Sequence, residues 1–207
     1  MVNWMTSSAN QIIGLYRRHA QSWVLACGPK LREKIWLDLF LALIPEARTV
    51  LDVGCGAGDP IARYLTECGA DVTGIDASPE LIAIATQRFA NDKWIVADMR
   101  ALKLPDRFDA IIAWDSFFHL TPDDQRLTFP VFRQHAVAGC ALLFTSGTSL
   151  GEAIGEFEGE PLYHGSLDEA EYRQLLETHG FEVIQHIVED PECGGHTVWL
   201  ARLTDTP

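Results

Sequence analysis

A run of glycines flanked by carboxylates has the residue types needed to bind a nucleotide-like ligand. The β-branched, apolar residues 49–53 end at glycines in alternate positions (Gly54, Gly56 and Gly58), followed by Asp59-Pro60. Glycine lacks a Cβ, so it adopts positive φ and lets backbone approach a ligand closely. A helix that starts next to such a turn offers free N–H groups to a negative group. The stretch therefore predicts a strand, a tight turn and a helix, with a ligand bound at the turn.

Three further aspartates follow neighbouring apolar segments. Asp76, Asp98 and Asp115 each come after a predicted strand, and in open α/β sheets ligands bind outside the carboxyl ends of the strands. Asp76 is placed to accept hydrogen bonds from two vicinal ribose hydroxyls, and Asp98 from the exocyclic amino group of adenine. The dinucleotide pattern G-x-G-x-x-G needs its third glycine where Asp59 stands. The set therefore describes a nucleoside site without a clear need for a pyrophosphate cradle.

The elements that would position these residues alternate along the chain. Strands are predicted at 49–53, 71–75, 93–97, 108–113, 140–145, 181–189 and 196–203, and helices at 10–27, 30–44, 60–68, 79–89, 122–135 and 168–178. Nearly all-apolar strands alternating with helices indicate a parallel sheet covered on both faces. The last two strands, joined by a short turn, predict an antiparallel hairpin.

Local signals refine this outline. Ser78-Pro79-Glu80 and Thr121-Pro122-Asp123 have the order of an N-cap, a first-turn proline and an acid, which is typical of a helix start. Pro130 should kink or split the helix that follows Thr121. Ser166-Leu167-Asp168-Glu169 is interpreted as a capping box.

Residues 146–166 interrupt the alternation. They contain five glycines and four glutamates, and we expect a long irregular loop that leaves the carboxyl end of a strand and folds over the site as a lid. An acidic lid would favour a cationic or amine acceptor.

The motifs together resemble the class I S-adenosylmethionine-dependent methyltransferases. The resemblance rests on Leu51-Asp52-Val53-Gly54-Cys55-Gly56-Ala57-Gly58, Gly74-Ile75-Asp76-Ala77-Ser78, Val96-Ala97-Asp98-Met99 and Phe108-Asp109-Ala110-Ile111, and covers about residues 48–145. It implies an α/β, Rossmann-like three-layer sandwich with a seven-stranded, mostly parallel sheet whose last strand is antiparallel. From the apolar spacing and the chain length we expect two N-terminal helices before the sheet and a single domain over residues 1–207, in which residues 1–46 are a helical cap.

The same resemblance implies how the cofactor is held. The three glycines would approach the methionine and ribose parts, Asp76 would hold the ribose hydroxyls, and Asp98 and Met99 would contact adenine. The full predicted cofactor set is Asp52, Gly54, Cys55, Gly56, Gly58, Asp59, Asp76, Ala77, Ser78, Asp98, Met99 and Trp114. Asp59 has two open interpretations, a contact to the ligand amino group or the N-cap of the next helix.

The predicted function is methyl transfer from S-adenosylmethionine to a small-molecule acceptor, with S-adenosylhomocysteine as product. Methyl transfer needs alignment above all, and a base only where the acceptor must lose a proton. The candidate base is His119. The acceptor-pocket candidates are Tyr16, Trp23, Phe117, Phe118, Tyr163 and His164. The alternatives are a non-catalytic nucleoside-binding or regulatory module on this fold, and a nicotinamide- or flavin-dependent oxidoreductase, which Asp59 disfavours.

Composition limits the partners. The 207 residues carry a net charge of −13, which opposes binding to nucleic acid or to an anionic membrane. The five cysteines form no C-x-x-C pair, which fits a cytoplasmic protein and predicts no metal site. We expect no signal peptide, because Arg17 and Arg18 stand where an apolar core would be. Oligomeric state, monomer or homodimer, stays open.

Overall fold

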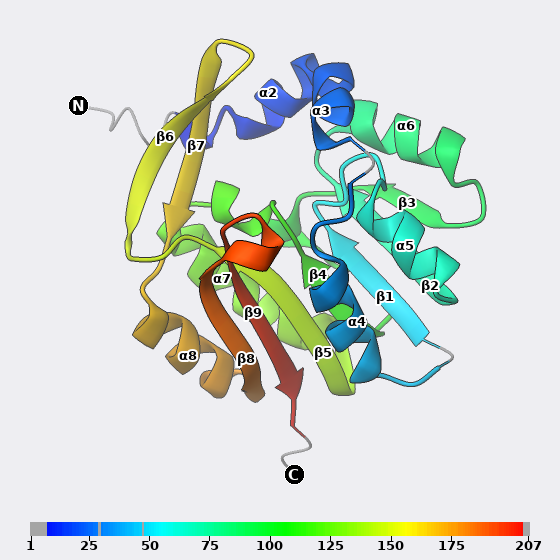
Figure 1. The fold of residues 1–207 in the computed structure, drawn as a ribbon, viewed down its shortest axis with the longest axis vertical. Coiled ribbons are helices and arrows are strands. Elements are labelled where there is room, and N and C mark those ends of the chain that lie inside the picture. Colours follow the sequence, from blue (N-terminus) through cyan, green and yellow to red (C-terminus); the bar gives the residue numbers. More distant parts are fainter. Residues whose placement is uncertain (1–7, 29, 47, 205–207) are drawn as a thin grey trace.

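A seven-stranded sheet forms the centre of the computed structural model, which describes residues 8–28, 30–46 and 48–204. The strands lie in the order β3-β2-β1-β4-β5-β9-β8 (Figure 1). Their bounds are β1 Arg48–Val53, β2 Ala70–Asp76, β3 Lys93–Val96, β4 Phe108–Ala113, β5 Ala136–Ser146, β8 Phe181–Asp190 and β9 His196–Leu203. The first five are parallel, and β9 is antiparallel to both β5 and β8. The predicted fold class, including the antiparallel last strand, is confirmed.

The strand order reverses beside β1. The chain runs outward from β1 to β2 and β3, then returns to β4 on the other side of β1. Such a switch point leaves a crevice at the carboxyl ends of the strands. Gly54 follows β1, Asp76 ends β2 and Asp115 lies just beyond β4, so all three face this crevice from adjacent strands.

Helices cover both faces of the sheet. On one face, α4 (Lys34–Ala42) and α5 (Ile61–Glu67) pack on Val50, Val72 and Ile112. On the other face, α7 (Pro122–His135) and α8 (Glu169–Thr178) pack on Ile111 and Phe144. Helix α6 (Pro79–Arg88) lies beside β2 and β3. Alternate strand residues enter opposite layers, which is why the central strands β1, β2, β4 and β5 are mostly apolar.

The N-terminal segment forms two short helices where one helix over 10–27 was predicted. They are α2 (Ile12–Arg18) and α3 (Ala20–Cys27), and the helix breaks at His19. The break lets each helix bury its own apolar face. Ile12 and Leu15 of α2 pack with Tyr163, whereas Ala20 of α3 packs with Ala57 and Leu81. Both helices lie next to the carboxyl-end crevice (Figure 1).

The prediction of an irregular loop at 146–166 is wrong. Most of it is an antiparallel hairpin of β6 (Gly151–Phe157) and β7 (Glu160–Ser166), which projects beside α2 (Figure 1). Glu158 and Gly159 turn the chain with φ values of 52° and 77°, the left-handed pair that two-residue hairpin turns require. Ile154, Phe157 and Leu162 pack with α2, so apolar contact orders a segment whose glycines suggested a loop.

Two local expectations can be compared with the structure. Of the kink or split expected at Pro130, the split is absent: α7 is one continuous helix, with Phe129 and Phe132 beside the proline buried in the core. The capping residue of α8 is Asp168, whose carboxylate accepts from the Glu171 N–H, and not Ser166, whose hydroxyl donates to the Leu167 carbonyl.

The described residues contain no candidate for a membrane-spanning helix. None of the helices placed there combines the length and the apolar character needed to cross a bilayer.

Candidate functional site

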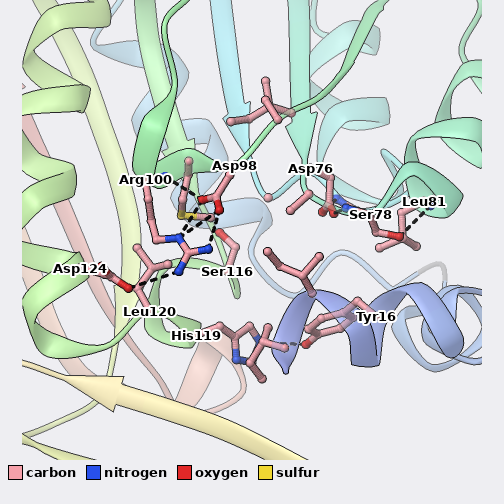
Figure 2. Close-up of a pocket in the computed structure, with 18 of the residues that line it drawn as sticks. Tyr16, Asp76, Ser78, Leu81, Asp98, Arg100, Ser116, His119, Leu120 and Asp124 are labelled. Carbon is pink, nitrogen blue, oxygen red and sulfur yellow. Dashed lines mark hydrogen bonds and ion pairs between the residues drawn. The ribbon is translucent and has the colours of Figure 1, made fainter. Parts of the chain in front are cut away.

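A first cavity opens at the switch point of the sheet. Its walls come from the ends of β1, β2, β3 and β4 and from α2, and include Gly54, Gly56, Asp76, Ala77, Ser78, Asp98, Met99, Arg100, Asp115, Ser116, His119 and Tyr16. Figure 2 shows the carboxylates of Asp76 and Asp98 on one side and the Tyr16–His119 pair on the other. The cavity joins residues far apart in sequence, from Ala9 to Asp124.

Asp76 is fixed at the cavity wall by two backbone donors. Its Oδ2 accepts from the Gly56 N–H at 3.0 Å, and its Oδ1 accepts from the Ser78 N–H at 2.8 Å. Burial raises the pKa of this carboxyl, and the two backbone bonds act against the rise. Each oxygen keeps a further lone pair, which is the geometry a pair of ribose hydroxyls needs.

Asp98 faces the cavity but already has a cationic partner. The guanidinium of Arg100 lies against both of its oxygens, at 3.0 Å from Nε, and Arg100 also reaches Asp124 at 3.4 Å (Figure 2). Burial opposes the ionised form, but the Arg100 hydrogen bonds outweigh it and lower the pKa of Asp98. Arg100, which sequence reasoning missed, therefore competes with any adenine amino group for this carboxylate.

The glycine turn approaches the cavity with two of its three glycines. Gly54 and Gly56 line it, with φ values of 77° and 56°. A Cβ on Gly54 would lie 2.3 Å from the Ser116 Cβ, so no other residue fits there. Gly58 lies in neither cavity wall. A Cβ there would meet Trp94 at 2.7 Å, so Gly58 serves the packing behind the turn.

A second cavity adjoins the first and shares Trp23, Gly54, Gly56 and Asp115 with it. It is also lined by the predicted residues Asp52, Cys55, Asp59 and Trp114. Asp52 is 3% exposed, and its carboxylate has no hydrogen-bond or ion-pair partner within residues 8–28, 30–46 and 48–204. Burial, and secondarily the charge of Asp76, raises the pKa of Asp52 to about 7.

Asp59 does not cap the next helix. Pro60 is the N-cap of α5, and the Asp59 Oδ2 instead accepts from Arg63. The other oxygen, Oδ1, is buried without a partner among the residues that the structure describes. Of the two interpretations of Asp59, a contact to a ligand amino group is the one that stays.

His119 is buried between two partners. Its Nδ1 lies 2.8 Å from the Tyr163 carbonyl, which fixes that nitrogen as the donor. Its Nε2 then accepts from the Tyr16 hydroxyl at 2.8 Å (Figure 2). Burial lowers the pKa of His119 to about 4, so the ring is neutral near pH 7. Tyr16, whose pKa burial raises, keeps its proton and presents its hydroxyl to the cavity.

The remaining acceptor-pocket candidates separate into two groups. Trp23 lines both cavities, and its ring packs edge-on against Tyr16 with centroids 5.0 Å apart. Phe117 belongs to the core, packed among Phe129, Phe132 and Phe144, and Tyr163 is fully buried with its hydroxyl donating to Glu152. Phe118 and His164 contact His119 from behind, outside the walls of both cavities.

A paired Asp115 and His196 form the main feature that the predicted site residues omitted. The His196 Nε2 donates to Asp115 Oδ1 at 2.9 Å, and this bond raises the pKa of His196 to about 9. Asp115 has a φ of 49°, unusual for a residue with a side chain, and lines both cavities. For Asp115 the available sequence signal was its position after a predicted strand. His196 lies 81 residues further along the chain, and no sequence signal linked it to Asp115.

A metal-binding arrangement is not found in the described part of the chain. No group of three His, Cys, Asp or Glu side chains there is arranged to hold an ion.

Comparison with known proteins identifies the family of the central segment. Residues 50–138 match the family model described as "Methyltransferase domain". The chain is 42% identical over 82 residues to a malonyl-[acyl-carrier protein] O-methyltransferase of Pseudescherichia vulneris, a match covering 38% of this chain and 32% of that protein. A phosphoethanolamine N-methyltransferase of Caenorhabditis elegans is 28% identical over 117 residues, covering 54% and 26%. The chain thus spans about a third of the length of such relatives.

Solved structures show the same fold over nearly the whole chain. The 1,6-didemethyltoxoflavin-N1-methyltransferase of Burkholderia thailandensis superposes with a TM-score of 0.75 at 20% identity, covering 97% of this chain and 90% of that one. A sugar N-methyltransferase from Streptoalloteichus gives 0.73 at 18% identity, covering 89% and 93%. Residues 50–138 thus match a methyltransferase domain, and the chain shares its fold with solved methyltransferase structures, in agreement with the resemblance that the sequence motifs predicted.

Proposed function

We propose that the protein transfers a methyl group from S-adenosylmethionine to a small-molecule acceptor. The observation that carries the proposal is Asp76, held at the end of β2 by the Gly56 and Ser78 N–H groups and facing the same cavity as Asp98 and Met99. The family match over residues 50–138 supports it, and the relatives named above are all methyltransferases.

The residues present fit this cofactor. Asp76 offers acceptors for the ribose, and Ala77, Leu81 and Met99 give the first cavity an apolar wall suited to adenine. Gly54 and Gly56 bring bare backbone to the junction of the cavities. The buried, unpartnered carboxylate of Asp52 suits a cationic group, and with Asp59 it would hold the ligand ammonium.

Alignment is the main task left to the protein. The cofactor supplies a methyl group on a sulfonium, which is already a good leaving group. Tyr16 lines the first cavity and Trp23 lines both, so their rings would help to exclude water from the bound cofactor. His119, with a pKa of about 4, is a weak proton acceptor, so its role in this proposal is to orient the Tyr16 hydroxyl.

Further parts of the proposal concern partners and location. A net charge of −13 supports a small-molecule acceptor over nucleic acid or a membrane surface. None of the five cysteines is in a disulfide, which supports a reducing, cytoplasmic location. We also propose that residues 1–207 act as one domain, with 1–46 as a cap and the β6–β7 hairpin as a cover of the site.

Calorimetric titration of S-adenosylhomocysteine into wild type and Asp76→Asn tests the proposal. We expect the variant to bind about 10- to 100-fold more weakly, because the carboxamide carries no charge and has only one acceptor oxygen, so its NH2 group cannot accept from a ribose hydroxyl. Asp71→Asn is the matched control, since Asp71 is an exposed carboxylate on the same strand. Tight binding of NAD(H) without binding of S-adenosylhomocysteine would contradict the proposal and favour an oxidoreductase.

A further inference from the structure

The two cavities meet at a junction formed by the residues that line both of them. Among the residues that the structure describes these are Trp23, Gly54, Gly56 and Asp115. The two glycines contribute only backbone, so Trp23 and Asp115 supply the side-chain chemistry of the junction. A Cβ on Gly56 would lie 3.5 Å from the Trp23 Nε1, which places the indole directly against the glycine turn.

The connectivity of the proposed cofactor determines which of its atoms lies at this junction. The proposal assigns the ribose to Asp76 in the first cavity, and the ammonium to Asp52 and Asp59 in the second. In S-adenosylmethionine the sulfur joins the ribose to the amino-acid part. A molecule bound in this way therefore has its sulfonium between the two cavities, where an aromatic ring and a carboxylate are both able to stabilise a cation.

Asp115 is held in place by two neighbouring strands. Its N–H donates to the Thr145 hydroxyl of β5 at 2.9 Å, and its Oδ1 accepts from the His196 Nε2 of β9 at 2.9 Å. The His196 Nδ1 lies 2.6 Å from the Cys193 carbonyl. Because both ring nitrogens of His196 face acceptors, both carry a proton and the ring is a cation. The carboxylate keeps further lone pairs on its two oxygens for a ligand.

The other charged side chains around the site each line one cavity only. Those of the second cavity are Lys30, Arg32, Glu33, Asp52, Asp59 and His196. Those of the first cavity are Asp76, Asp98, Arg100 and Asp124. Cations and carboxylates thus occur together in both walls, and the net charge of a wall does not decide what binds there. Asp115 differs from the rest by its position at the junction.

We propose that Trp23 and Asp115 hold the sulfonium of S-adenosylmethionine, so that the protein binds the methyl donor more tightly than the product S-adenosylhomocysteine. This inference rests on the methyl-transfer function proposed above. The donor carries a positive charge on sulfur, whereas the product has a neutral thioether. The indole face and the carboxylate therefore interact more strongly with the donor, and the charge of His196 offsets part of this attraction. Fresh donor then displaces the product more readily.

Calorimetric titrations of S-adenosylmethionine and S-adenosylhomocysteine into the protein, without an acceptor, measure this preference. We expect the sulfonium compound to bind the wild type about five- to twentyfold more tightly. Asp115→Asn keeps the shape of the side chain, and asparagine tolerates the positive φ at this position. We expect this variant to lower the affinity ratio at least about threefold, through weaker binding of the donor.

Further variants separate the effect of charge from an effect on the fold. Trp23→Leu should lower the ratio as well, whereas Trp23→Phe, which keeps an aromatic face, should retain most of it. These two variants also test the inference if Asp115→Asn does not fold. His196→Gln keeps a donor for Asp115 and removes the cation, so the ratio should not fall. Glu182→Gln, an exposed change on β8, is the matched control and should leave both affinities unchanged.

The outcomes distinguish this inference from the proposed function. If neither compound binds the wild type, the methyl-transfer proposal fails, and this inference fails with it. If both bind with equal affinity, only the sulfonium inference is overturned. A preference that survives in both Asp115→Asn and Trp23→Leu overturns it too, because the additional methyl group would then be its source. So does a ratio that falls as far in His196→Gln as in Asp115→Asn.

Discussion

At the scale of a single residue, the buried carboxylate of Asp52 in the proposed ligand site lowers the stability of the fold. Its carboxyl is buried beside the glycine turn, and a pKa of about 7 means that ionisation is unfavourable in the folded chain. The folded state therefore binds more protons than the unfolded state between about pH 4 and 7. Stability contributed by the protonated carboxyl is lost as the pH rises through this range.

Replacing Asp52 by asparagine should raise the stability of the fold and lower its affinity for the ligand. We expect Asp52→Asn to raise the free energy of unfolding at pH 7.5 by about 1–3 kcal/mol, because no buried charge has to form. The same change should weaken binding of S-adenosylhomocysteine. Urea unfolding and calorimetry measure the two effects. A variant that is less stable than wild type at pH 7.5 but equal at pH 4.5 would contradict the prediction.

Individual site residues were predictable where one local pattern determined their position. Gly54, Gly56 and Asp76 follow apolar strands directly, and the structure brings them to one cavity. Phe117, although next to the site in sequence, lies in a short 3-10 helix (Phe117–His119) that turns its ring into the core against Phe129, Phe132 and Phe144. The Asp115–His196 pair depends on β9 lying beside β5, which no local pattern specifies.

At the scale of elements, the β6–β7 hairpin packs against helices α2 and α3, and together they make up the cover that we propose for the site. The Phe157 ring near the hairpin turn lies 6.4 Å from that of Tyr16, 6.1 Å from His19 and 5.8 Å from Trp23. Arg18 and His19 also bond to Glu160 across the same boundary. These contacts link the hairpin to the two aromatic residues that line the cavities.

Removing the Phe157 ring should loosen this cover without unfolding the sheet. We expect Phe157→Ala to increase amide hydrogen exchange in residues 12–27 and to weaken S-adenosylhomocysteine binding by about three- to tenfold. The global unfolding free energy should change by about 1 kcal/mol or less, since Phe157 is only half-buried at the edge of the molecule. Leu150→Ala, exposed before β6, is the control. Unchanged exchange in 12–27 would show that the hairpin does not hold the helices.

The elements themselves were mostly predictable, and the exceptions have a physical cause. The central strands, buried on both faces, give apolar runs, and the edge strands β3 and β8 were also located from their apolar residues. The hairpin at 151–166 was not, because its apolar residues face α2 and not the main core. The helix break at His19 likewise follows from two different packing partners, which spacing alone does not reveal.

At the scale of the whole molecule, the pH dependence of stability should reflect two histidines whose pKa values are shifted in opposite directions. The pKa of His119, about 4, lies below its ordinary value, so protonation favours the unfolded chain as the pH falls below 6.5. The pKa of His196, about 9, lies above it, so its stabilisation is complete below 6.5 and is lost as the pH rises through 9.

The loss of unfolding free energy at alkaline pH can be assigned to the Asp115–His196 pair. We expect the wild type to lose about 1–3 kcal/mol of unfolding free energy between pH 6.5 and 9.5, and His196→Gln to lose distinctly less. The bond to Asp115 is the reason, because it stabilises the charged ring. Urea unfolding at the two pH values measures the difference. Parallel profiles for the two proteins would remove His196 as the cause.

The walls shared by the two cavities make their ligands thermodynamically dependent on each other. Trp23 and Asp115 line both, so a molecule that immobilises them in one cavity also prepares the other. Such coupling is reciprocal: whatever factor the cofactor contributes to acceptor affinity, the acceptor returns to the cofactor. We therefore expect a cofactor and an acceptor that both contact Trp23 to favour the ternary complex over either binary one.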